Sequence, residues 1–260
     1  MATIVSFLTE TGGHLALRIL TLNTHKGFGH FNRKFLLPEL REAVRAVAAD
    51  VVFMQEVQGA HEKKAFRHAR WPDAPHYEFL ADSIWPHHAY GRNAVYPMGH
   101  HGNALMSKFL IIDYRNVDAS ITKAEKRGLL HCRIDKPDDS DKPLHAFCVH
   151  LGLLEKHRQT QLEQLCDLVS SIPESEPVVV AGDFNDWQGK ARKVMASCGL
   201  TDVFEARWGG PPKTFPAIFP LFRLDRIYVR GVSEHEPIKL PNRPWAHLSD
   251  HAPLAAEITL

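Results

Sequence analysis

The sequence predicts two β-sheets packed face to face, with helices on their outer sides. Helical patterns occur mainly in three places, after the first strand, after His150 and after Asn185, whereas strand-like runs dominate elsewhere. A doubly wound parallel sheet would instead alternate strands and helices along the whole chain. The 260 residues contain no internal repeat, linker or low-complexity tract. We therefore expect a single domain over residues 15–260, preceded by a flexible lead-in at residues 1–14.

Composition limits the class of protein. The net charge is only +1, so no overall field draws the surface toward nucleic acid or anionic lipid. No apolar run reaches the roughly 18 residues of a membrane span, and the N-terminal MATIVSFLTE lacks the features of a signal peptide. We therefore expect a cytoplasmic protein. The four cysteines have no CxxC spacing and are expected to be reduced structural thiols: Cys132, Cys148, Cys166 and Cys198.

The N-terminal half is predicted to contain two strands separated by a helix. Residues 15–23 (LALRILTLN) form the first strand, and apolar residues at helical spacing over 36–47 predict the helix. Residues 50–54 return as a strand that ends at Glu56. Residues 58–102 are long and rich in turn-forming residues, so we expect a functional loop or lid there.

The rest of the chain is predicted to contain the remaining strands. A helical pattern over 154–169 leads into a buried strand at 178–181. A polar helix follows around 188–198, and then an apolar loop at 214–222 that is either an exposed rim or part of the core. Further strands are expected at 103–106, 109–114, 128–134, 145–150 and 223–231, and the chain ends with the segment 248–260.

The stretch VVVAGDFND presents a carboxylate and an amide together. Gly182 lets the backbone turn, and Asp183 and Asn185 stand one period-2 step apart, so they project from the same edge of the strand end. A carboxylate can hold a cation or orient a water molecule, and an amide can donate to a phosphoryl oxygen. The pair therefore suits metal-assisted attack on a phosphate ester. On its own, however, GDFN is equally well interpreted as a strand followed by an Asx turn.

Other polar residues stand at or just beyond the ends of predicted strands in the same way. A site built on sheets gathers its side chains at such ends, and random placement would rarely produce this coincidence. The set comprises Asn23, Glu56, Asn103, His150, Asp183, Asn185, Asp225, Asp250 and His251.

Around these positions the sequence resembles the endonuclease/exonuclease/phosphatase superfamily, which includes DNase I-like nucleases, apurinic endonucleases, inositol phosphatases and neutral sphingomyelinases. Seven short motifs occur in the family's order, from about residue 17 to the C-terminus. The resemblance implies an α/β protein with the four-layer α/β/β/α sandwich of DNase I. The motifs are LNTH (22–25), QEV (55–57), GNALMS (102–107), VHL (149–151), GDFN (182–185), LDRIYV (224–229) and SDHAPL (249–254).

The resemblance also implies a metal site. Glu56 would be the principal ligand of a Mg²⁺ or Mn²⁺ ion, with Asn23 and Asp250 near the same ion. Hard carboxylate and amide oxygens suit these ions, and the sequence offers no thiolate site. His25 stands where apurinic endonucleases place an aspartate, which argues against a second metal and against that specific activity.

The implied catalytic groups lie in the C-terminal motifs. Asp225 and His251 match a pair in which the carboxylate fixes the imidazole tautomer and stabilises its charged form. His150 matches a second catalytic histidine, and Asn185 is expected to donate to the phosphoryl group. Either Asp183 or His251 would take the proton from water. The residues expected to contact substrate are Asn103, Arg127, Tyr90 and Asn93, although Arg127 is equally well interpreted as an exposed arginine on a hairpin.

A histidine-rich stretch admits two interpretations. His87, His88, His100 and His101 invite a zinc site, but their adjacent-pair spacing matches no common structural-zinc pattern. We interpret them as part of a cleft rim.

The substrate class stays open at this point. The fold and metal chemistry are compatible with a DNA or RNA nuclease, a small-molecule phosphatase or a sphingomyelinase-like phospholipid phosphodiesterase. We expect a phosphodiesterase that acts as a monomer without an obligate protein partner; a non-catalytic binding module would need a broken site. Basic clusters that could follow a nucleic-acid backbone are Arg33-Lys34, Lys63-Lys64-Arg67-Arg70 and Lys190-Arg192-Lys193, while Phe219 and Phe222 could contact a lipid.

Overall fold

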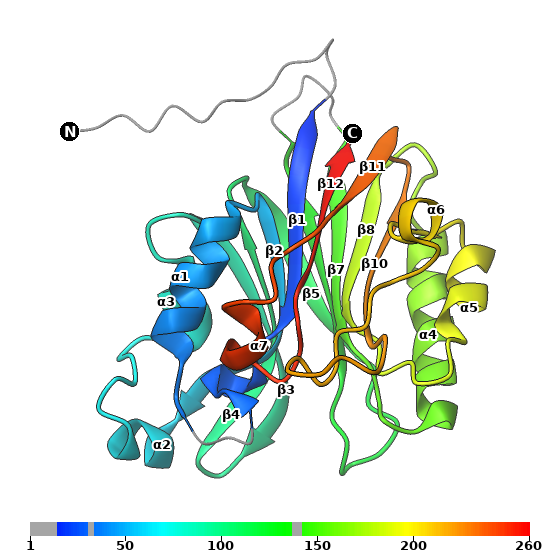
Figure 1. The fold of residues 1–260 in the computed structure, drawn as a ribbon. Coiled ribbons are helices and arrows are strands. Elements are labelled where there is room, and N and C mark those ends of the chain that lie inside the picture. Colours follow the sequence, from blue (N-terminus) through cyan, green and yellow to red (C-terminus); the bar gives the residue numbers. More distant parts are fainter. Residues whose placement is uncertain (1–14, 31–33, 137–141) are drawn as a thin grey trace.

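The protein contains two six-stranded sheets that pack face to face (Figure 1). The computed structural model describes residues 15–30, 34–136 and 142–260, so the expected lead-in at 1–14 lies outside the described residues. In spatial order, sheet 1 comprises β11 (Glu234–Ile238), β12 (Leu254–Thr259), β1 (Ala16–Asn23), β2 (Val51–His61), β4 (Gly99–Ser107) and β3 (His87–Tyr96).

Sheet 2 has a matching centre. In sheet 1 the two central strands, β1 and β2, run parallel to each other, and the strands next to them are antiparallel. The two central strands of sheet 2 are arranged in the same way. In spatial order, sheet 2 comprises β5 (Ile111–Asp118), β6 (Gly128–Ile134), β7 (Leu144–His150), β8 (Val178–Asp183), β10 (Asp225–Arg230) and β9 (Thr201–Asp202).

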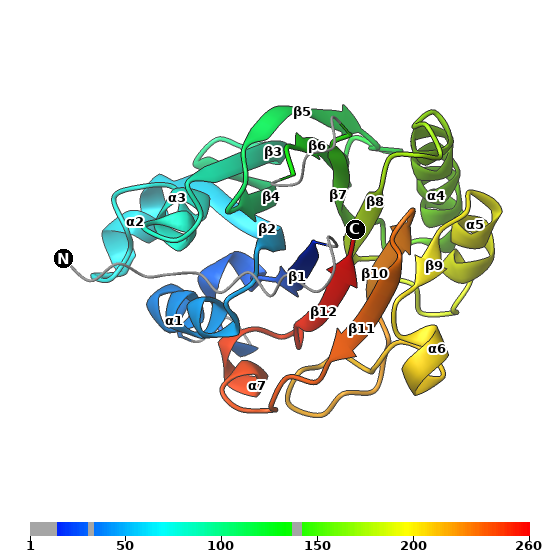
Figure 2. The same cartoon turned by 90° about the horizontal axis from the view of Figure 1, so that it is seen from above.

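Helices cover the outer face of each sheet (Figure 2). Residues of α1 (Leu37–Val47), α3 (His76–Ala81) and α7 (Trp245–Leu248) share a buried cluster with sheet 1. Residues of α4 (Glu155–Ser170) and α5 (Ala191–Ser197) share another with sheet 2. This arrangement confirms the predicted four-layer α/β/β/α sandwich. Two short helices, α2 (Glu62–Arg67) and α6 (Glu205–Trp208), lie at the periphery (Figure 1).

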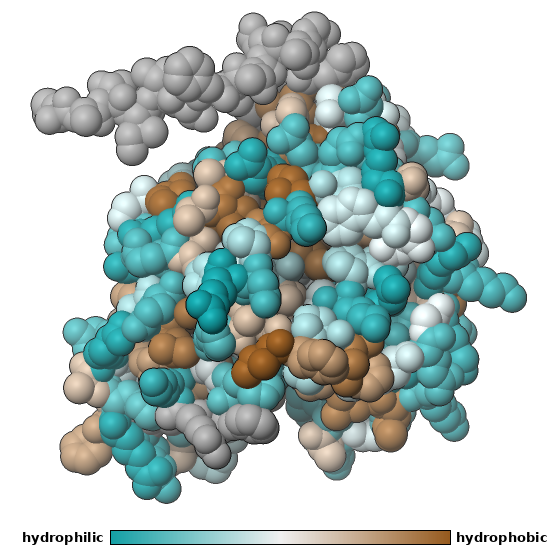
Figure 3. All heavy atoms as spheres, in the orientation of Figure 1, coloured by the Kyte–Doolittle hydropathy of each residue, from teal (hydrophilic) through white to brown (hydrophobic). Residues whose placement is uncertain are grey.

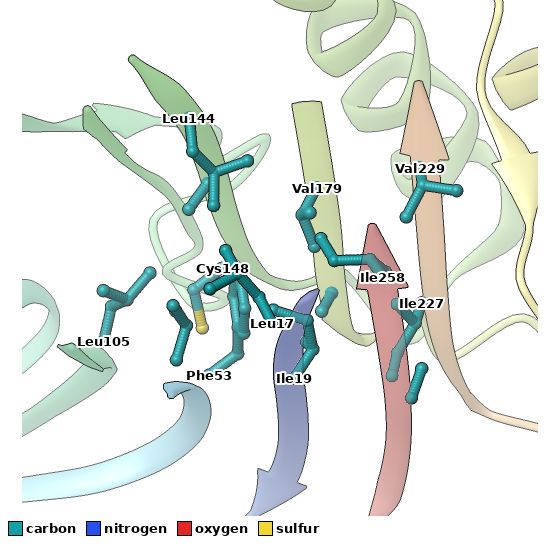
Figure 4. Close-up of a cluster of buried hydrophobic side chains, with 14 of the residues drawn as sticks. Leu17, Ile19, Phe53, Leu105, Leu144, Cys148, Val179, Ile227, Val229 and Ile258 are labelled. Atoms are coloured by element: carbon teal, nitrogen blue, oxygen red, sulfur yellow. The ribbon is translucent and has the colours of Figure 1, made fainter. Parts of the chain in front are cut away.

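The inner faces of the two sheets form the central core (Figure 4). Leu17, Ile19 and Phe53 from sheet 1 meet Cys148 and Val179 from sheet 2, and all are buried. Alternation along each strand thus divides the side chains between this core and the outer helical layers. The four cysteines are free, as expected for reduced structural thiols.

The parallel strand pairs of both sheets finish at the same end of the sandwich, which we call the site end. The register places Asn23 beside Gln55 in sheet 1 and His150 beside Asp183 in sheet 2. A hydrogen bond between the side chains of Asn23 and Asp183 joins the two sheets there. The strand ends therefore bring residues that are distant in sequence into one place.

Several sequence-based expectations about secondary structure were wrong. Residues 58–102 contain α2, α3 and β3 rather than a long loop. The edge strand β3 is partly exposed on both faces, so it lacks the apolar alternation that identifies a half-buried strand. The strand expected at 109–114 lies at Ile111–Asp118, and β9, β11, α6 and α7 were not predicted. None of the helices in the described residues is long and apolar enough to span a membrane.

Candidate active site

The sequence predicted that Glu56 stands at the end of a strand. It lies instead inside β2, at a bulge. The pairing of β2 with β4 shifts between Met54 and Val57, so Gln55 and Glu56 both lie opposite Asn103. Glu56 has a φ of 54°, a left-handed conformation that is strained for a residue with a side chain. A bulge of this kind re-aims a side chain. The backbone thus turns Glu56 out of the regular alternation of the strand.

Lys26, which no motif in the sequence indicated, forms an ion pair with Glu56. It belongs to a short 3₁₀ turn at His25–Gly27, in which His25 and Lys26 also have positive φ values. Burial raises the pKa of Glu56, but the charge of Lys26, with smaller contributions from His150 and His25, brings it well below its usual range. The only signal in the sequence was the position of this lysine directly after LNTH.

Asp183 is the centre of the polar contacts at the site end. Its Oδ2 accepts a hydrogen bond of 3.3 Å from Asn23 Nδ2 and lies 3.5 Å from His150 Nε2 and 3.7 Å from His251 Nε2. Its Oδ1 accepts the backbone N–H of Asn185 at 2.9 Å. The carboxyl is only 1% exposed, and this burial raises its pKa.

His251 is held by Asp225, as the resemblance implies. The distance between His251 Nδ1 and Asp225 Oδ2 is 2.9 Å, and Phe215 packs against the imidazole with ring centroids 4.9 Å apart. Burial lowers the pKa of His251, but the charges of Asp225 and Asp183 outweigh burial and raise it to about 10. Because Asp225 occupies Nδ1, the other ring nitrogen is the one near Asp183.

His150 has the opposite electrostatic character. It ends β7 beside Asp183, but burial, together with the positive charge of Arg127, lowers its pKa to about 4. The two imidazoles next to Asp183 therefore differ, one favouring its charged form and the other its neutral form. Only the neutral form of an imidazole offers both a donor and an acceptor nitrogen.

Asp250 and Asn23 lie together near His25. Asp250 Oδ1 is 3.7 Å from His25 Nδ1, and Asn23 Oδ1 accepts the backbone N–H of His25 at 3.0 Å. Ser249 Oγ donates to the backbone carbonyl of Asn23 at 2.6 Å, which ties the loop before β12 to the end of β1. Asn23 and Asp250, two of the three expected metal ligands, thus both lie next to His25.

Asn185 carries both a functional expectation and a structural task. Its φ is 48°, and its Nδ2 donates to the carbonyl of Leu151 at 2.9 Å, so it links the turn after β8 to the loop after β7. An amide nitrogen has two hydrogens, so one donor is left for a substrate oxygen. Its contact with a phosphoryl group stays a prediction.

Asn103 bridges the two sheets from the middle of β4. It is fully buried, and its Nδ2 donates to the carbonyls of Gly128 at 2.9 Å and Cys148 at 3.1 Å. A Cβ at Gly128 would lie 2.2 Å from Asn93 Oδ1, so this glycine leaves space for the Asn93 side chain. Asn103 therefore has a structural function beside its expected contact with substrate.

The other expected substrate contacts lie around this bridge. Arg127 donates to Glu125 at 3.3 Å, and its side chain is only 15% exposed, so it is not an exposed hairpin residue. Tyr90 Oη is 2.9 Å from His100 Nδ1, and Asn93 Oδ1 accepts a hydrogen bond of 2.9 Å from Asn116. Their roles toward a substrate stay predictions.

The four histidines of the 87–101 stretch do not form one group. His87 pairs with Ser107, far from the hairpin end of β3 and β4, whereas His100 pairs with Val95 near that hairpin. His87 and His88 therefore lie away from the site end, so the expectation that all four line a cleft rim was wrong. The antiparallel course of β3 and β4 separates the two pairs.

The donor set fits a hard divalent cation. Glu56, Asp250 and Asn23 supply carboxylate and amide oxygens, and the ammonium of Lys26 already places a positive charge against Glu56. Asp183, Asp225 and His251 form a second group, with ligand atoms all within 4.8 Å of one another. Both groups are rich in the oxygen ligands that Mg²⁺ and Mn²⁺ prefer.

An apolar cavity of about 720 Å³ lies beside the site rather than over it. Its walls come from α6, α7, β11 and the loop before β10, and they include none of the expected catalytic residues or metal ligands. The polar cluster around Asp183 is thus the part of the molecule in which the expected chemistry is concentrated.

Comparison with known proteins identifies relatives over almost the whole chain. Residues 20–251 match the model of the Endonuclease/Exonuclease/phosphatase family. The protein YbhP of Escherichia coli (strain K12) is 56% identical over 246 residues, which cover 94% of this chain and 97% of YbhP. YbhP of Shigella flexneri matches to the same extent.

Solved structures show the same fold at low sequence identity. An endonuclease/exonuclease/phosphatase from Beutenbergia cavernae DSM 12333 superposes with a TM-score of 0.75 at 21% identity, covering 94% of this chain and 72% of that one. The endonuclease/exonuclease/phosphatase from Bacteroides vulgatus gives a TM-score of 0.68 at 18% identity, with coverage of 94% and 98%. A humanized TDP2 of D. rerio gives 0.64 at 20% identity, also with coverage of 94% and 98%.

Proposed function

Since the chain belongs to the endonuclease/exonuclease/phosphatase family, we propose that it is a divalent-metal-dependent phosphoesterase that hydrolyses a phosphate ester bond by attack of water. We further propose a phosphodiester as the substrate. The observation that carries the proposal is the position of Asp183 within 3.7 Å of two imidazoles, one of which is fixed by Asp225. Such a cluster supplies a proton acceptor next to groups that can stabilise negative charge.

Glu56, with Asn23 and Asp250, would hold the metal ion. An ion bound there would stabilise the negative charge that develops on the phosphoryl oxygens in the transition state. It would thereby lower the barrier to hydrolysis. Lys26 would compete with the ion for Glu56, since its ammonium already pairs with that carboxylate.

The remaining steps are carried by the protein's own side chains. Asp183 would take a proton from the attacking water, because its Oδ2 lies in the middle of the cluster while its Oδ1 is fixed by Asn185. His251, oriented by Asp225, would donate to a phosphoryl oxygen from Nε2. His150 would contact the same phosphoryl group from the other side of Asp183.

Hydrolysis of a soluble diester tests this proposal. Bis(p-nitrophenyl) phosphate should be hydrolysed with Mg²⁺ or Mn²⁺, while p-nitrophenyl phosphate, a monoester, should be a poor substrate. Labelled oxygen from H₂¹⁸O should appear in the phosphate product and not in the alcohol. Asp183→Asn, which keeps the shape of the side chain, should lower kcat by about 10³-fold. Turnover that needs no divalent ion, or label in the alcohol, would contradict the proposal.

A further inference from the structure

Exposed apolar side chains gather around the site end. Leu153 and Leu154 follow three and four residues after His150, Trp187 lies two residues after Asn185, and Phe222 lies three residues before Asp225. Figure 3 shows brown atoms gathered near the bottom of the view, over the loop that precedes β10. Such a gathering is uncommon on a soluble monomer and marks an interaction surface. We call it the apolar rim and define it as Ile121, Leu153, Leu154, Trp187, Ile218, Phe219, Leu221 and Phe222.

Contacts between loops join the rim into one surface. The ring of Trp187 lies edge-on to Phe222, with centroids 4.9 Å apart. On its other side, the loop of Trp187 is tied to the start of α4 by the ion pair of Lys190 with Glu155 at 3.4 Å. The backbone N–H of Leu153 donates to Glu125 at 2.9 Å, which connects the loop of Ile121. The rim therefore follows the site from one loop to the next.

Positive charge accompanies the apolar residues. Lys123 and Lys126 are exposed on the loop of Ile121, and Lys156 is exposed in the first turn of α4. The carboxylates there are held in ion pairs, Glu125 with Arg127 and His157, and Glu155 with Arg158 and Lys190. The rim thus combines exposed hydrocarbon with a local excess of positive charge, although the whole chain is almost neutral.

This composition favours a lipid surface over a nucleic acid. Single-stranded nucleic acids bind by stacking their bases on aromatic rings. Most of the rim is aliphatic, as in Leu153, Leu154 and Leu221, and aliphatic side chains cannot stack in that way. Exposed Leu and Phe side chains with flanking lysines instead match the features that insert into the headgroup region of an anionic membrane.

We propose that the site end docks on an anionic lipid surface and that the substrate is a phosphate ester of a lipid. This proposal rests on the proposed function and specifies its substrate class. The rim would contact the hydrocarbon of the bilayer while the phosphate reaches the cluster around Asp183. A P–O ester bond would break, the water oxygen would bond to phosphorus, and the two protons of water would end on the released alcohol and the phosphate product.

Vesicle binding without turnover tests the docking separately from the chemistry. In EDTA, the protein should sediment with vesicles of phosphatidylcholine mixed with phosphatidylglycerol, and much less with phosphatidylcholine alone. Leu153→Ser with Leu154→Ser, and Phe219→Ser with Phe222→Ser, should each weaken binding by about tenfold or more. Leu110→Ser is the matched control. Leu110 is 51% exposed against 57% for Leu153, but lies at the opposite end of the sheets.

Three results would overturn the lipid proposal. The first is that the wild-type protein does not sediment with anionic vesicles. The second is that the two double variants bind these vesicles as well as the Leu110 control does. The third is that a single-stranded oligonucleotide binds the protein more tightly than vesicles do and that this binding is lost in the same variants. Hydrolysis of bis(p-nitrophenyl) phosphate by the wild-type protein is measured alongside. Its failure would count against the proposed function, whereas failure of vesicle binding would count against the lipid surface alone.

Discussion

Two carboxylates stand at the site end, one on each sheet, and their surroundings shift their pKa values in opposite directions. Burial disfavours the charge of both. At Glu56 on sheet 1, the ammonium of Lys26 and nearby imidazoles outweigh burial, so the pKa falls. At Asp183 on sheet 2, burial prevails and the pKa rises. Glu56, whose charged form is favoured, is therefore suited to bind a cation. Asp183, whose protonated form is favoured, is suited to accept a proton.

Backbone geometry accounts for the difference. The bulge in β2 leaves the Glu56 side chain 19% exposed and within reach of the turn that carries Lys26. Asp183 ends the regular strand β8, between β7 and β10, and its side chain is only 1% exposed. An irregular strand thus gives one carboxylate access to a counter-ion, while a regular one encloses the other.

The loop before β12 connects the two halves. Asp250 lies near His25 on the sheet 1 side, whereas the next residue, His251, contacts Asp225 of sheet 2. Two adjacent residues therefore contribute to different parts of the site, Asp250 to the expected metal site and His251 to the cluster around Asp183.

The largest expected effect comes from the carboxylate of sheet 1. Glu56→Gln keeps the size of the side chain but removes the charge that a cation needs, so activity should fall by about 10³-fold or more. The variant should also lose the thermal stabilisation by Mn²⁺ that follows from binding to the folded state alone. Differential scanning fluorimetry measures this shift. Glu257→Gln on β12 is the control, and a Glu56→Gln protein with an unchanged Mn²⁺ shift would remove Glu56 from the metal site.

The next effect tests the cluster around Asp183. Asp225→Asn and His251→Ala should each lower kcat by about 10²–10⁴-fold, because both disturb one oriented imidazole. Their losses should not multiply, since two residues that act as a unit are lost together. Steady-state kinetics of the two single variants and the double variant decide this. Multiplicative losses would mean that the 2.9 Å contact has no catalytic consequence.

The sequence predicted the fold because its central strands carry simple signals. Strands such as β7 and β8 are short apolar runs followed by polar residues, which is the pattern of a strand buried on both faces. Motif order then supplied the four-layer arrangement. The edge strands β3 and β11 were missed, since both are partly exposed and lack the apolar alternation of a half-buried strand.

The sequence predicted which residues form the candidate site better than it predicted how they are arranged. The motifs singled out Asp183, Asp225 and His251, which the fold brings together. No pattern in the sequence indicated that a bulge would carry Glu56, or that Lys26 would reach it. Both depend on the register of β2 against β4 and on a turn with positive φ values, which only tertiary structure defines.

A pH experiment tests whether burial dominates titration in sheet 2 away from the site. Burial, with the neighbouring charges of His145 and Arg115, lowers the pKa of His131 to about 3 from its ordinary value of 6.5. Between these pH values the unfolded chain binds more protons than the folded one, so the free energy of unfolding should fall as the pH is lowered below 6.5. The loss due to His131 should reach about 3 kcal/mol near pH 4.

Urea unfolding at several pH values measures this loss. His131→Gln should flatten the dependence of stability on pH in this range, whereas His88→Gln, at an exposed position, should leave it unchanged. An equal slope in wild type and His131→Gln would show that burial does not control this histidine. The dominance of burial over nearby charges in sheet 2 would then be limited to Asp183 and would not extend to the rest of the sheet.

The smallest expected effect concerns Lys26, whose ion pair sets Glu56 apart from Asp183. A cation at Glu56 would meet the like charge of the ammonium, so Lys26→Met should strengthen Mn²⁺ binding by about 1 kcal/mol, or roughly fivefold in Kd. Isothermal titration calorimetry measures it directly. Lys108→Met, which breaks a similar ion pair with Asp50 at the opposite end of the sheets, should leave the Kd unchanged. Weaker Mn²⁺ binding in Lys26→Met would show instead that the lysine positions Glu56 for the ion, so that cation and ammonium act together rather than compete.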